Sequence, residues 1–315
     1  MVVCAYSEAR WNDLCETIGS LLAQRPEPGE ITLVIDNNDA LLERARARFA
    51  GVNVVPNKLG QGLSTARNTG IAESTGAFVA FIDDDAVIAP DVIARLAAAA
   101  RQPGTLGATA NIRPDWIGRR PRWFPDAYLW TVGCTHEPAA GRIVNVRNVT
   151  GAACLFRREV FVVCGTFSQV LGRGKGRIPV SCEETELCIR ALERFPGQGF
   201  VRDEGALVDH KVPAARLTWR YFLIRCYAEG LSKGRLRALM RSGAAFETER
   251  SYVLSSLIPS AAQALLTGLT RLDGGALGRA AAIMLGLAAA TLGYAGARVV
   301  PAARRETTPS FEGNA

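Results

Sequence analysis

Three consecutive aspartates, Asp83, Asp84 and Asp85, are the residues in this chain whose type and spacing are best suited to chemistry. They follow Ala77–Ile82, an apolar run that predicts a strand buried on both faces. Adjacent carboxylates repel one another, so a hard divalent cation, Mg²⁺ or Mn²⁺, shared with a substrate phosphate would stabilise the triplet. The alternative is an acidic turn that caps the helix expected after Asp91.

Two adjacent glutamates, Glu183 and Glu184, form a second candidate group. Leu187, Ala191 and Leu192 follow at helical spacing, so the pair occupies the first turn of a helix. Carboxylates in that position are favoured by the helix macrodipole, which is a purely structural explanation. The functional explanation is a general base held rigidly at the helix start and pointed into a cleft, where neighbouring carboxylates raise one another's proton affinity.

His210 is the histidine best placed for a role in the same site. It follows the apolar run Ala206–Val208, so we expect it at or just past a strand end, on the same sheet edge as the aspartates. A ligand role and a purely structural role both fit a single histidine in that position.

The elements that position these residues follow an α/β pattern. Apolar strands are expected at 2–6, 31–35, 52–55 and 77–82, with amphipathic helices between them. The first helix has Leu14, Ile18, Leu21 and Leu22 on its buried stripe, after Ser7 as an N-cap. Right-handed crossovers make such strands parallel, so the polar residues at their ends converge on one edge as a nucleotide-sized crevice. The predicted fold class is a doubly wound α/β sheet flanked by helices.

The pattern loosens in the second half of the chain. Residues 112–125 mix tryptophan, phenylalanine and arginine and are expected to form a long loop. That loop can stack on sugar rings, lie against lipid head groups, or act as a linker anchored by its aromatic side chains. Asn148–Phe156 is expected to be a further strand.

Composition limits the class of partner. The 315 residues carry a net charge of +7, which fits an anionic partner such as a nucleotide, a phosphate or a lipid head group. No dense Lys/Arg block is present, so we expect no nucleic-acid surface. The eight cysteines include no CxxC pair, so neither a zinc site nor a disulfide framework is indicated. Met1–Tyr6 has no charged leader, and we expect a cytoplasmic protein.

Taken together, these stretches resemble the family 2 inverting glycosyltransferases, which have the A-type nucleotide-sugar transferase (GT-A) fold. The resemblance covers roughly residues 1–235 and depends on motifs in a fixed order: Cys4–Glu8, Asp36, Gly62–Gly70, Asp83–Asp85 and Cys182–Leu187. It implies a GT-A-like mixed sheet flanked by helices, and the uncharged segments described below add a C-terminal apolar helical extension. It also implies a divalent metal cofactor, Mg²⁺ or Mn²⁺, and a nucleotide-sugar donor.

The resemblance implies donor-binding roles for these matching residues: Tyr6, Glu8, Asp36, Arg67, Asp83 and Asp84. Tyr6 and Glu8 would line the base pocket, and Asp36 would hydrogen-bond the nucleobase. Arg67 would support the acidic motif or the diphosphate, and Asp83 would approach the ribose.

The metal and catalytic roles are implied in the same way. Asp85 would ligate the metal that bridges the diphosphate, with His210 as a further ligand. The usual Glu-Asp pair of the family is Glu183-Glu184 here, so the base falls on Glu184, one methylene longer. Such a base would take the proton from the acceptor hydroxyl as it attacks the anomeric carbon.

The implied reaction moves a sugar from a nucleotide-diphosphate sugar to a saccharide or polyprenyl-linked acceptor in polysaccharide or glycolipid biosynthesis. Arg122–Pro125, Trp130–Cys134 and Trp219–Lys233 are similar to actinobacterial enzymes of that kind. A glucuronosyltransferase acting on a glucosyl polyprenyl phosphate is one alternative. A sugar nucleotidyltransferase is another, although Ser7–Arg10 is a poor match to its Gly-rich loop. A non-catalytic scaffold is the third.

Two uncharged segments, 251–270 and 280–297, follow the catalytic motifs. Each is near the length of a spanning helix, about 18–20 residues. Arg271 and Arg279 flank the connection between them, which disfavours its export. We expect a helical hairpin in or against the cytoplasmic leaflet of the plasma membrane, making a peripheral membrane contact near a lipid-linked acceptor. A soluble helical pair packed on the catalytic domain is the alternative.

The expected organisation is therefore a catalytic domain at 1–235, a helical region at 236–300 and a disordered tail at 301–315. Within the catalytic domain, 1–110 would bind the nucleotide and 111–235 would bind the acceptor and carry the catalytic residues.

Overall fold

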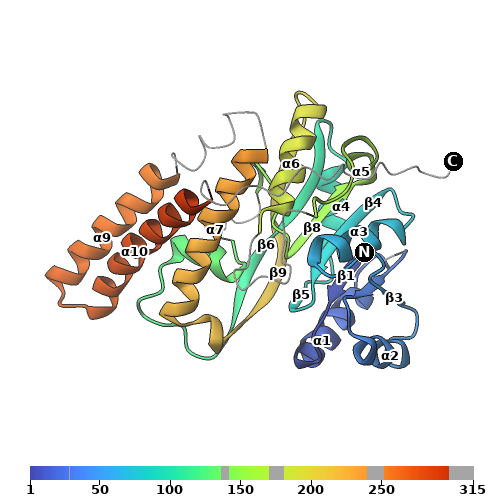
Figure 1. Cartoon of the computed structure of the whole chain (residues 1–315), viewed down its shortest axis with the longest axis horizontal. Helices are drawn as coiled ribbons and strands as arrows, with labels where there is room; N and C mark the ends of the chain where they lie inside the picture. The colour runs from blue at the N-terminus through green and yellow to red at the C-terminus, as the bar shows by residue number, and fades with distance from the viewer. Residues whose placement is uncertain (28, 136–141, 170–180, 240–251, 298–315) are drawn as a thin grey trace.

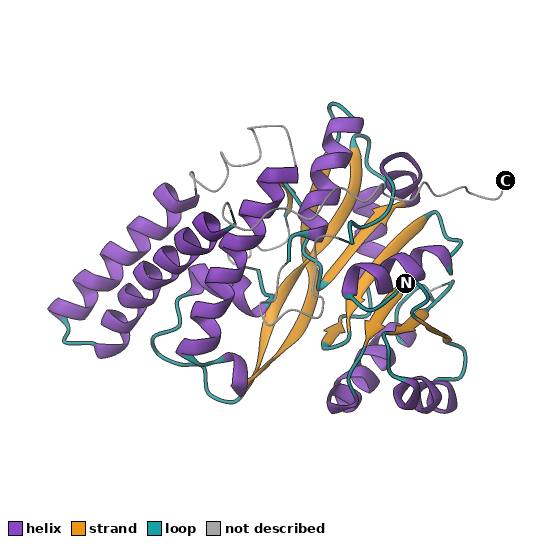
Figure 2. Cartoon of the chain, in the orientation of Figure 1, coloured by secondary structure: helices purple, strands orange, loops and turns teal. Residues whose placement is uncertain are grey.

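The computed structural model describes residues 1–27, 29–135, 142–169, 181–239 and 252–297, and its elements are drawn in Figures 1 and 2. The expected tail at 301–315 and part of the region at 236–300 lie outside these residues. The strands are β1 Val2–Ala5, β2 Thr32–Ile35, β3 Asn53–Pro56, β4 Phe78–Asp83, β5 Ala86–Ile88, β6 Thr105–Ile117, β7 Ile143–Val146, β8 Ala153–Arg157 and β9 Gly199–Pro213.

Helices cover both faces of the sheet, and a helical extension projects from one end of it (Figure 2). The α-helices are α1 Trp11–Leu22, α2 Asp39–Arg48, α3 Leu63–Ala72, α4 Val92–Ala100, α5 Arg158–Cys164, α6 Glu183–Arg194, α7 Trp219–Leu239, α9 Ile258–Thr270 and α10 Gly274–Gly296. Short helical turns lie at η1 Glu8–Arg10, η2 Asp126–Val132, η3 Ala214–Arg216 and η5 Val253–Leu257.

The described strands form one mixed sheet in the order β3-β2-β1-β4-β8-β6-β9-β5, with β7 on β9. The four N-terminal strands pair in parallel, which confirms the prediction for this half. β8 is antiparallel to β4 and β6, and β9 is parallel to β6 but antiparallel to β5 and β7. The predicted doubly wound, mixed α/β sheet is confirmed.

Side-chain alternation along β4 divides the core into two layers. Val79 and Phe81 belong to the cluster beneath α3, α5 and α6. Ala80 and Ile82 belong to the cluster on the other face, beneath α1, α2 and α4. All four side chains are buried, as the prediction of a strand covered on both faces requires. The strand is thereby fixed, and its polar end at Asp83 is held at the sheet edge.

The first helix differs slightly from its predicted pattern. Leu14, Ile18 and Leu21 are buried as expected, but Leu22 is 48% exposed because the helix ends there and its side chain turns away from the sheet. Ser7 caps the short turn η1 rather than α1: its hydroxyl accepts from the Ala9 amide. The short turn η1 therefore connects β1 to α1.

The prediction of a long loop at 112–125 is wrong for its first half. Residues 112–117 continue β6, where they pair in parallel with β9. Alternating residues become exposed there because the strand pair extends beyond the helices, and Arg113 forms two hydrogen bonds to Asp209 across it at 2.8 and 2.9 Å. The remainder is anchored on α7: Trp123 stacks on Trp219 with ring centroids 4.1 Å apart, as the linker alternative predicts.

Two further boundaries need correction. The strand expected at 148–156 begins only at Ala153, since the preceding residues form a turn that enters the site. His210 lies inside β9 rather than at its end, because β9 continues along β6 as far as Pro213.

The C-terminal hairpin is confirmed in the described residues, where α9 and α10 lie side by side and α10 packs along α7 (Figure 1). α10 begins at Gly274, not at 280, because Asp273 caps it by accepting from the Gly275 amide. Val253–Thr270 and Gly274–Gly296 are both long and apolar enough to cross a membrane. A Cβ on Gly230 of α7 would collide with the carbonyl of Ala290, so these two helices pack with their backbones in contact.

Candidate active site

A cavity of about 600 Å³ opens at the edge of the sheet where the parallel strands end. All the site residues predicted from sequence except Glu8 line it: Tyr6, Asp36, Arg67, Asp83, Asp84, Asp85, Glu183, Glu184 and His210. Residues of α3, α6, α7 and η2 complete its walls. The prediction that the aspartates and the paired glutamates face one cavity is therefore met.

Backbone pairing on both sides fixes the aspartate turn. Asp83 is the last residue of β4, and its amide donates to the carbonyl of Ala152 (3.0 Å). The carbonyl of Asp85 accepts from the Lys211 amide of β9 (2.9 Å). Because the main chain of the turn is used in this way, its carboxylates project from the sheet edge into the cavity.

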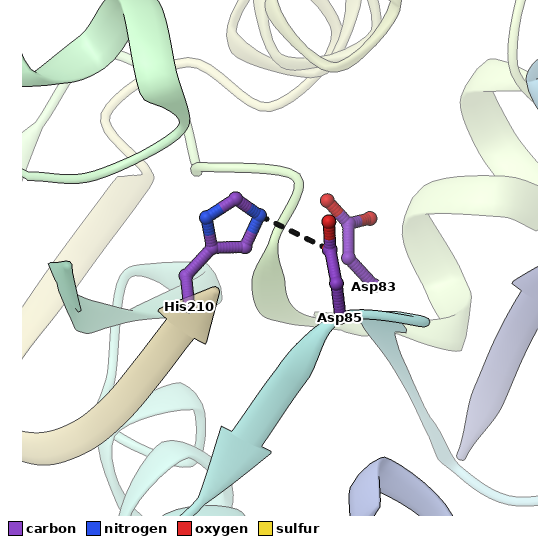
Figure 3. A group of neighbouring side chains, drawn as sticks. All are labelled: Asp83, Asp85 and His210. Carbon is purple, nitrogen blue, oxygen red and sulfur yellow. Dashed lines mark ion pairs between the residues drawn. The ribbon is translucent and has the colours of Figure 1, made fainter. Parts of the chain in front are cut away.

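Asp83, Asp85 and His210 form a cluster with the geometry of a cation site (Figure 3). One ligand atom from each residue lies within 4.8 Å of the other two, and His210 Nε2 is 3.1 Å from Asp85 Oδ1. The pairing of β5 with β9 sets Ala86 opposite His210 and so brings the imidazole to the turn. Carboxylate oxygens suit hard divalent cations, and an imidazole can complete their coordination. The sequence predicts Asp85 and His210 as ligands; the fold adds Asp83.

Two arginines that sequence reasoning missed neutralise the same turn. Arg10 NH1 lies 2.7 Å from Asp84 Oδ1 and 3.3 Å from Asp85 Oδ2, and Arg216 NH2 lies 3.1 Å from Asp85 Oδ2. Both line the cavity. Arg10 lies in the turn before α1 and Arg216 in the turn after β9. Nothing local in the sequence marks either residue, because only the fold brings these two turns to the aspartates.

The aspartates of the turn are electrostatically unequal. Burial raises the pKa of Asp84 to about 6, with Asp85 and Asp83 adding to the effect and Arg10 opposing it. Burial also acts to raise the pKa of Asp85, but a hydrogen bond from His210 and the charges of His210, Arg10 and Arg216 hold it below its ordinary value. Asp84 Oδ2 is buried and has no hydrogen-bond partner among the described residues. The turn therefore has a carboxylate oxygen that can still accept a hydrogen bond or bind a cation.

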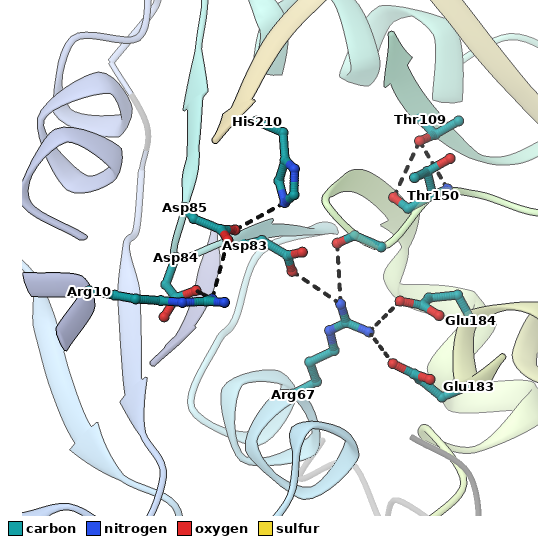
Figure 4. Close-up of polar contacts among 11 residues, drawn as sticks. Arg10, Arg67, Asp83, Asp84, Asp85, Thr109, Thr150, Glu183, Glu184 and His210 are labelled. Carbon is teal, nitrogen blue, oxygen red and sulfur yellow. Dashed lines mark hydrogen bonds and ion pairs between the residues drawn. The ribbon is translucent and has the colours of Figure 1, made fainter. Parts of the chain in front are cut away.

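Arg67 of α3 connects the aspartates to the glutamates (Figure 4). Its NH1 lies 2.6 Å from Glu184 Oε1 and 3.2 Å from Glu183 Oε1, and its NH2 lies 3.5 Å from Asp83 Oδ1. Burial acts to lower the pKa of Arg67, but Glu184, Glu183 and Asp83 raise it above its ordinary value. The guanidinium therefore stays protonated and fixes both glutamates in position.

The two glutamates differ in access. The side chain of Glu183 is 3% exposed and that of Glu184 14% exposed. Gly151, in the turn before β8, allows the approach: a Cβ there would collide with Glu184 Oε1, and the Gly151 carbonyl accepts from Arg67 NH2 (3.2 Å). Sequence reasoning missed Gly151 because that stretch was taken for a strand.

One end of the cavity is formed by residues at the end of β1 and just after β1 and β2. Asp36 lines it, while its two carboxylate oxygens accept from Asn57 Nδ2 (2.8 Å) and the Gly62 amide (3.0 Å). Tyr6 lines the cavity with its side chain largely exposed. Glu8 points elsewhere, 4.0 Å from Arg44 at the surface. Asp36 thus orders the loop beside it as well as forming the wall.

Two solved structures have a similar fold. The mannosyltransferase PcManGT of Pyrobaculum calidifontis, in complex with GDP-Man and Mn²⁺, has a TM-score of 0.58 and 15% identity, over 92% of this chain and 85% of that one. GalNAc-T7 with UDP, GalNAc and Mn²⁺ has a TM-score of 0.51 and 15% identity, over 81% of this chain and 53% of that one. Fold and cavity therefore define a protein of the GT-A-like class.

Sequence comparison places the chain within that class. The model of glycosyl transferase family 2 matches residues 1–164. The glucosyl-dolichyl phosphate glucuronosyltransferase of Haloferax volcanii is 34% identical over 237 residues, 74% of this chain and 75% of that protein. Succinoglycan biosynthesis protein ExoM of Rhizobium meliloti is 27% identical over 257 residues, 75% and 74% of the two chains. The chain belongs to glycosyl transferase family 2 and is a glycosyltransferase of glycan biosynthesis.

Proposed function

We propose that this enzyme is an inverting, divalent-metal-dependent transferase that moves a sugar from a nucleotide-diphosphate sugar to a polyprenyl-linked saccharide. The observation that supports it is the arrangement across one cavity: a carboxylate pair on one wall, a candidate cation site on the other, and Arg67 between them. In this proposal residues 1–110 bind the nucleotide, and the acceptor enters from the side of 111–235.

Glu184 is the proposed base, because it is the more accessible of the two glutamates. Its carboxylate takes the proton of the acceptor hydroxyl while the oxygen attacks the anomeric carbon. A bond forms between that oxygen and the anomeric carbon, and the bond to the phosphate oxygen breaks on the opposite face. The electron pair leaves with the nucleoside diphosphate, so the anomeric configuration inverts. Such a base contributes roughly 10²–10⁴-fold.

The leaving group is handled on the aspartate wall. Asp83, Asp85 and His210 would hold the divalent ion, which supplies neutralisation of the charge that develops on the diphosphate. Arg10 and Arg216 both contact Asp85, and they would add positive charge beside the diphosphate. Tyr6 and Asp36 would bind the nucleobase, and Asp84 would complete the donor pocket.

The proposed acceptor and location come from a relative and from the hairpin. The name of the Haloferax volcanii enzyme gives a glucosyl-dolichyl phosphate as acceptor and a glucuronosyl group as the sugar, and we propose the same acceptor class here. The hairpin exposes large apolar side chains along both helices: Leu254, Ile258, Leu265, Leu266, Leu269, Leu272, Met284, Leu285 and Leu292. We propose that this surface makes a peripheral contact with the cytoplasmic face of the plasma membrane.

Calorimetry with UDP and GDP, each with and without Mn²⁺, tests the donor site. We expect binding of one nucleotide that depends on the metal, and metal-independent binding, or none, would contradict the proposal. A screen of nucleotide-sugars that includes UDP-glucuronic acid, read as nucleoside diphosphate release, then identifies the donor. NMR of the glycosidic product tests inversion.

Pelleting tests the membrane contact. Full-length protein is expected to sediment with membranes without detergent, and a Leu266→Glu, Leu269→Glu variant to shift to the supernatant. A wild-type protein that stays wholly in the supernatant would contradict the contact and leave the donor experiment unaffected.

A further inference from the structure

The residue that precedes the paired glutamates has an unusual backbone. Cys182 is the N-cap of α6, with φ +81° and ψ 16°, and its side chain makes no capping hydrogen bond. The left-handed region is sparsely populated by residues other than glycine and persists only where the surroundings determine it. Because Glu183 and Glu184 directly follow Cys182, the backbone conformation of Cys182 determines the direction in which α6 starts and so the position of both carboxylates.

Two side chains of α7 hold this turn. The Ser181 amide donates to Ser232 Oγ (3.0 Å), and the Ser181 hydroxyl donates to Glu229 Oε2 (3.4 Å). Cys182 Sγ lies 3.9 Å from Glu229 Oε1 and donates to it. Glu229 and Ser232 are three positions apart on one helix and so share a face. Ser232 is fully buried, and its hydroxyl donates to the Ala228 carbonyl (2.7 Å), which leaves its lone pairs oriented toward Ser181.

The thiol of Cys182 is suited to this arrangement. Burial raises its pKa well above the ordinary value, and Glu229 adds to the effect, so the group stays protonated and donates. The side chain also packs in a small apolar cluster with Ile189, Leu231, Leu236 and Ala297. This cluster joins α6, α7 and the end of α10, so the turn is held by polar contacts on one side and by packing on the other.

We propose that Glu229 and Ser232 are positioning residues for the paired glutamates. They keep Cys182 in the left-handed conformation and thereby place the first turn of α6 against Arg67. Neither residue lines the cavity. This proposal rests on the proposed function, in which Glu184 is the base, and adds α7 as the helix that holds Glu184 in position.

Amide exchange measures the turn directly, without a substrate. The Glu186 amide donates to the Cys182 carbonyl (2.9 Å) and therefore reports the start of α6. In Glu229→Ala and in Ser232→Ala we expect exchange at Glu186 to rise roughly tenfold. Glu229→Gln keeps one acceptor oxygen for the Cys182 thiol, and its NH2 group can donate to the Ser181 hydroxyl in place of the bond that it accepts, so exchange should stay within about threefold of wild type. Arg237→Ala, which lies further along α7 and bonds Tyr294, is the matched control and should leave Glu186 unchanged.

Activity gives the second measurement. Nucleoside diphosphate release from the donor found in the screen should show kcat lowered about tenfold in Glu229→Ala, with donor KM little changed. A general loss of structure would instead alter both parameters. UDP and GDP calorimetry in the presence of Mn²⁺ should be unaffected in every variant. If the nucleotide does not bind even to the wild type, the proposed function fails, while the exchange result still decides whether α7 holds the turn.

A second-site change distinguishes positioning from packing. Glycine adopts the left-handed conformation without steric cost, so Cys182→Gly in the Glu229→Ala background should restore both the Glu186 exchange rate and kcat to within about threefold of wild type. If Glu229 acted only by packing, removing the Cys182 side chain from its cluster would make the double variant worse. Unchanged exchange in Glu229→Ala and Ser232→Ala, or the absence of rescue, would overturn the proposal.

Discussion

The carboxylates on the two walls of the cavity have different positively charged partners. On the aspartate wall, Arg10 and Arg216 come from two separate turns and form ion pairs with Asp84 and Asp85, and His210 lies 3.1 Å from Asp85. On the glutamate wall, one guanidinium in α3, Arg67, contacts both carboxylates and is itself 3% exposed. On the aspartate wall, a bound cation could replace an arginine as the partner of Asp85. The arrangement on the glutamate wall holds both glutamates in one position, which the proposed base would need in order to meet an acceptor.

The largest effect is expected on the glutamate wall. Glu184→Gln should lower kcat by roughly 10²–10⁴-fold, because the amide cannot accept the acceptor proton. Metal-dependent nucleotide affinity should be unchanged, which calorimetry would check. Glu183→Gln is the matched control. If it proves the more damaging substitution, the base is Glu183, and the two glutamates exchange roles.

Asp85→Asn should disrupt the candidate cation site on the aspartate wall. Removing this carboxylate is expected to weaken Mn²⁺-dependent UDP or GDP binding by about a hundredfold. Asp209→Asn alters a half-exposed aspartate of β9 that pairs with Arg113, and serves as control. If both variants bound the nucleotide equally well, the proposal that the cation binds at the aspartate wall would be contradicted.

Gly151→Ala should displace the base without changing its chemistry. The added Cβ collides with Glu184 Oε1 and lies 2.9 Å from Arg67 NH2, so the carboxylate must move. Displacements of about 1 Å can cost 10²-fold in rate, and we expect kcat to fall by roughly ten- to a hundredfold. Nucleotide binding should remain. A fully active variant would show that Glu184 does not need its position beside Gly151.

The raised pKa of Asp84 gives the aspartate wall a pH-dependent stability in the metal-free protein. A carboxyl group with a raised pKa contributes stability that is present in full below its ordinary value of 3.8 and is lost as pH rises through about 6. Asp84→Asn stays neutral at every pH. The free energy of unfolding of this variant, relative to wild type, should therefore increase by roughly 1–3 kcal/mol from pH 4 to pH 8 in urea titrations. A difference independent of pH would contradict the assignment.

Glu8→Gln lies outside both walls and should have the smallest effect. Its side chain is half exposed and 4.0 Å from Arg44, so donor KM and kcat are expected to stay within about twofold of wild type. Measurement of donor KM checks this. A large increase would return Glu8 to the base pocket that the resemblance implied.

What could be predicted from sequence depended on local signals. The apolar strand before Asp83 and the helical spacing after Glu184 each identify an element and its polar end, and both are found in the structure. Arg10, Arg216 and Gly151 could not be predicted, because their importance comes from residues distant in the sequence. β6 was also missed: no strand was expected at 105–111, and the outer residues of the strand, which lie beyond the core and lose the apolar pattern, were taken for a loop.

The close packing of α7 with α10 has a consequence for where the reaction takes place. A Cβ on Gly230 or on Gly293 would meet the backbone of the facing helix, so the backbones of α7 and α10 lie in direct contact. The same α7 carries Tyr221 and Arg225 into the cavity. In the membrane contact proposed above, the depth of the hairpin in the bilayer would therefore set the height of the cavity above the lipid, and with it the length of lipid-linked saccharide that could reach the donor site.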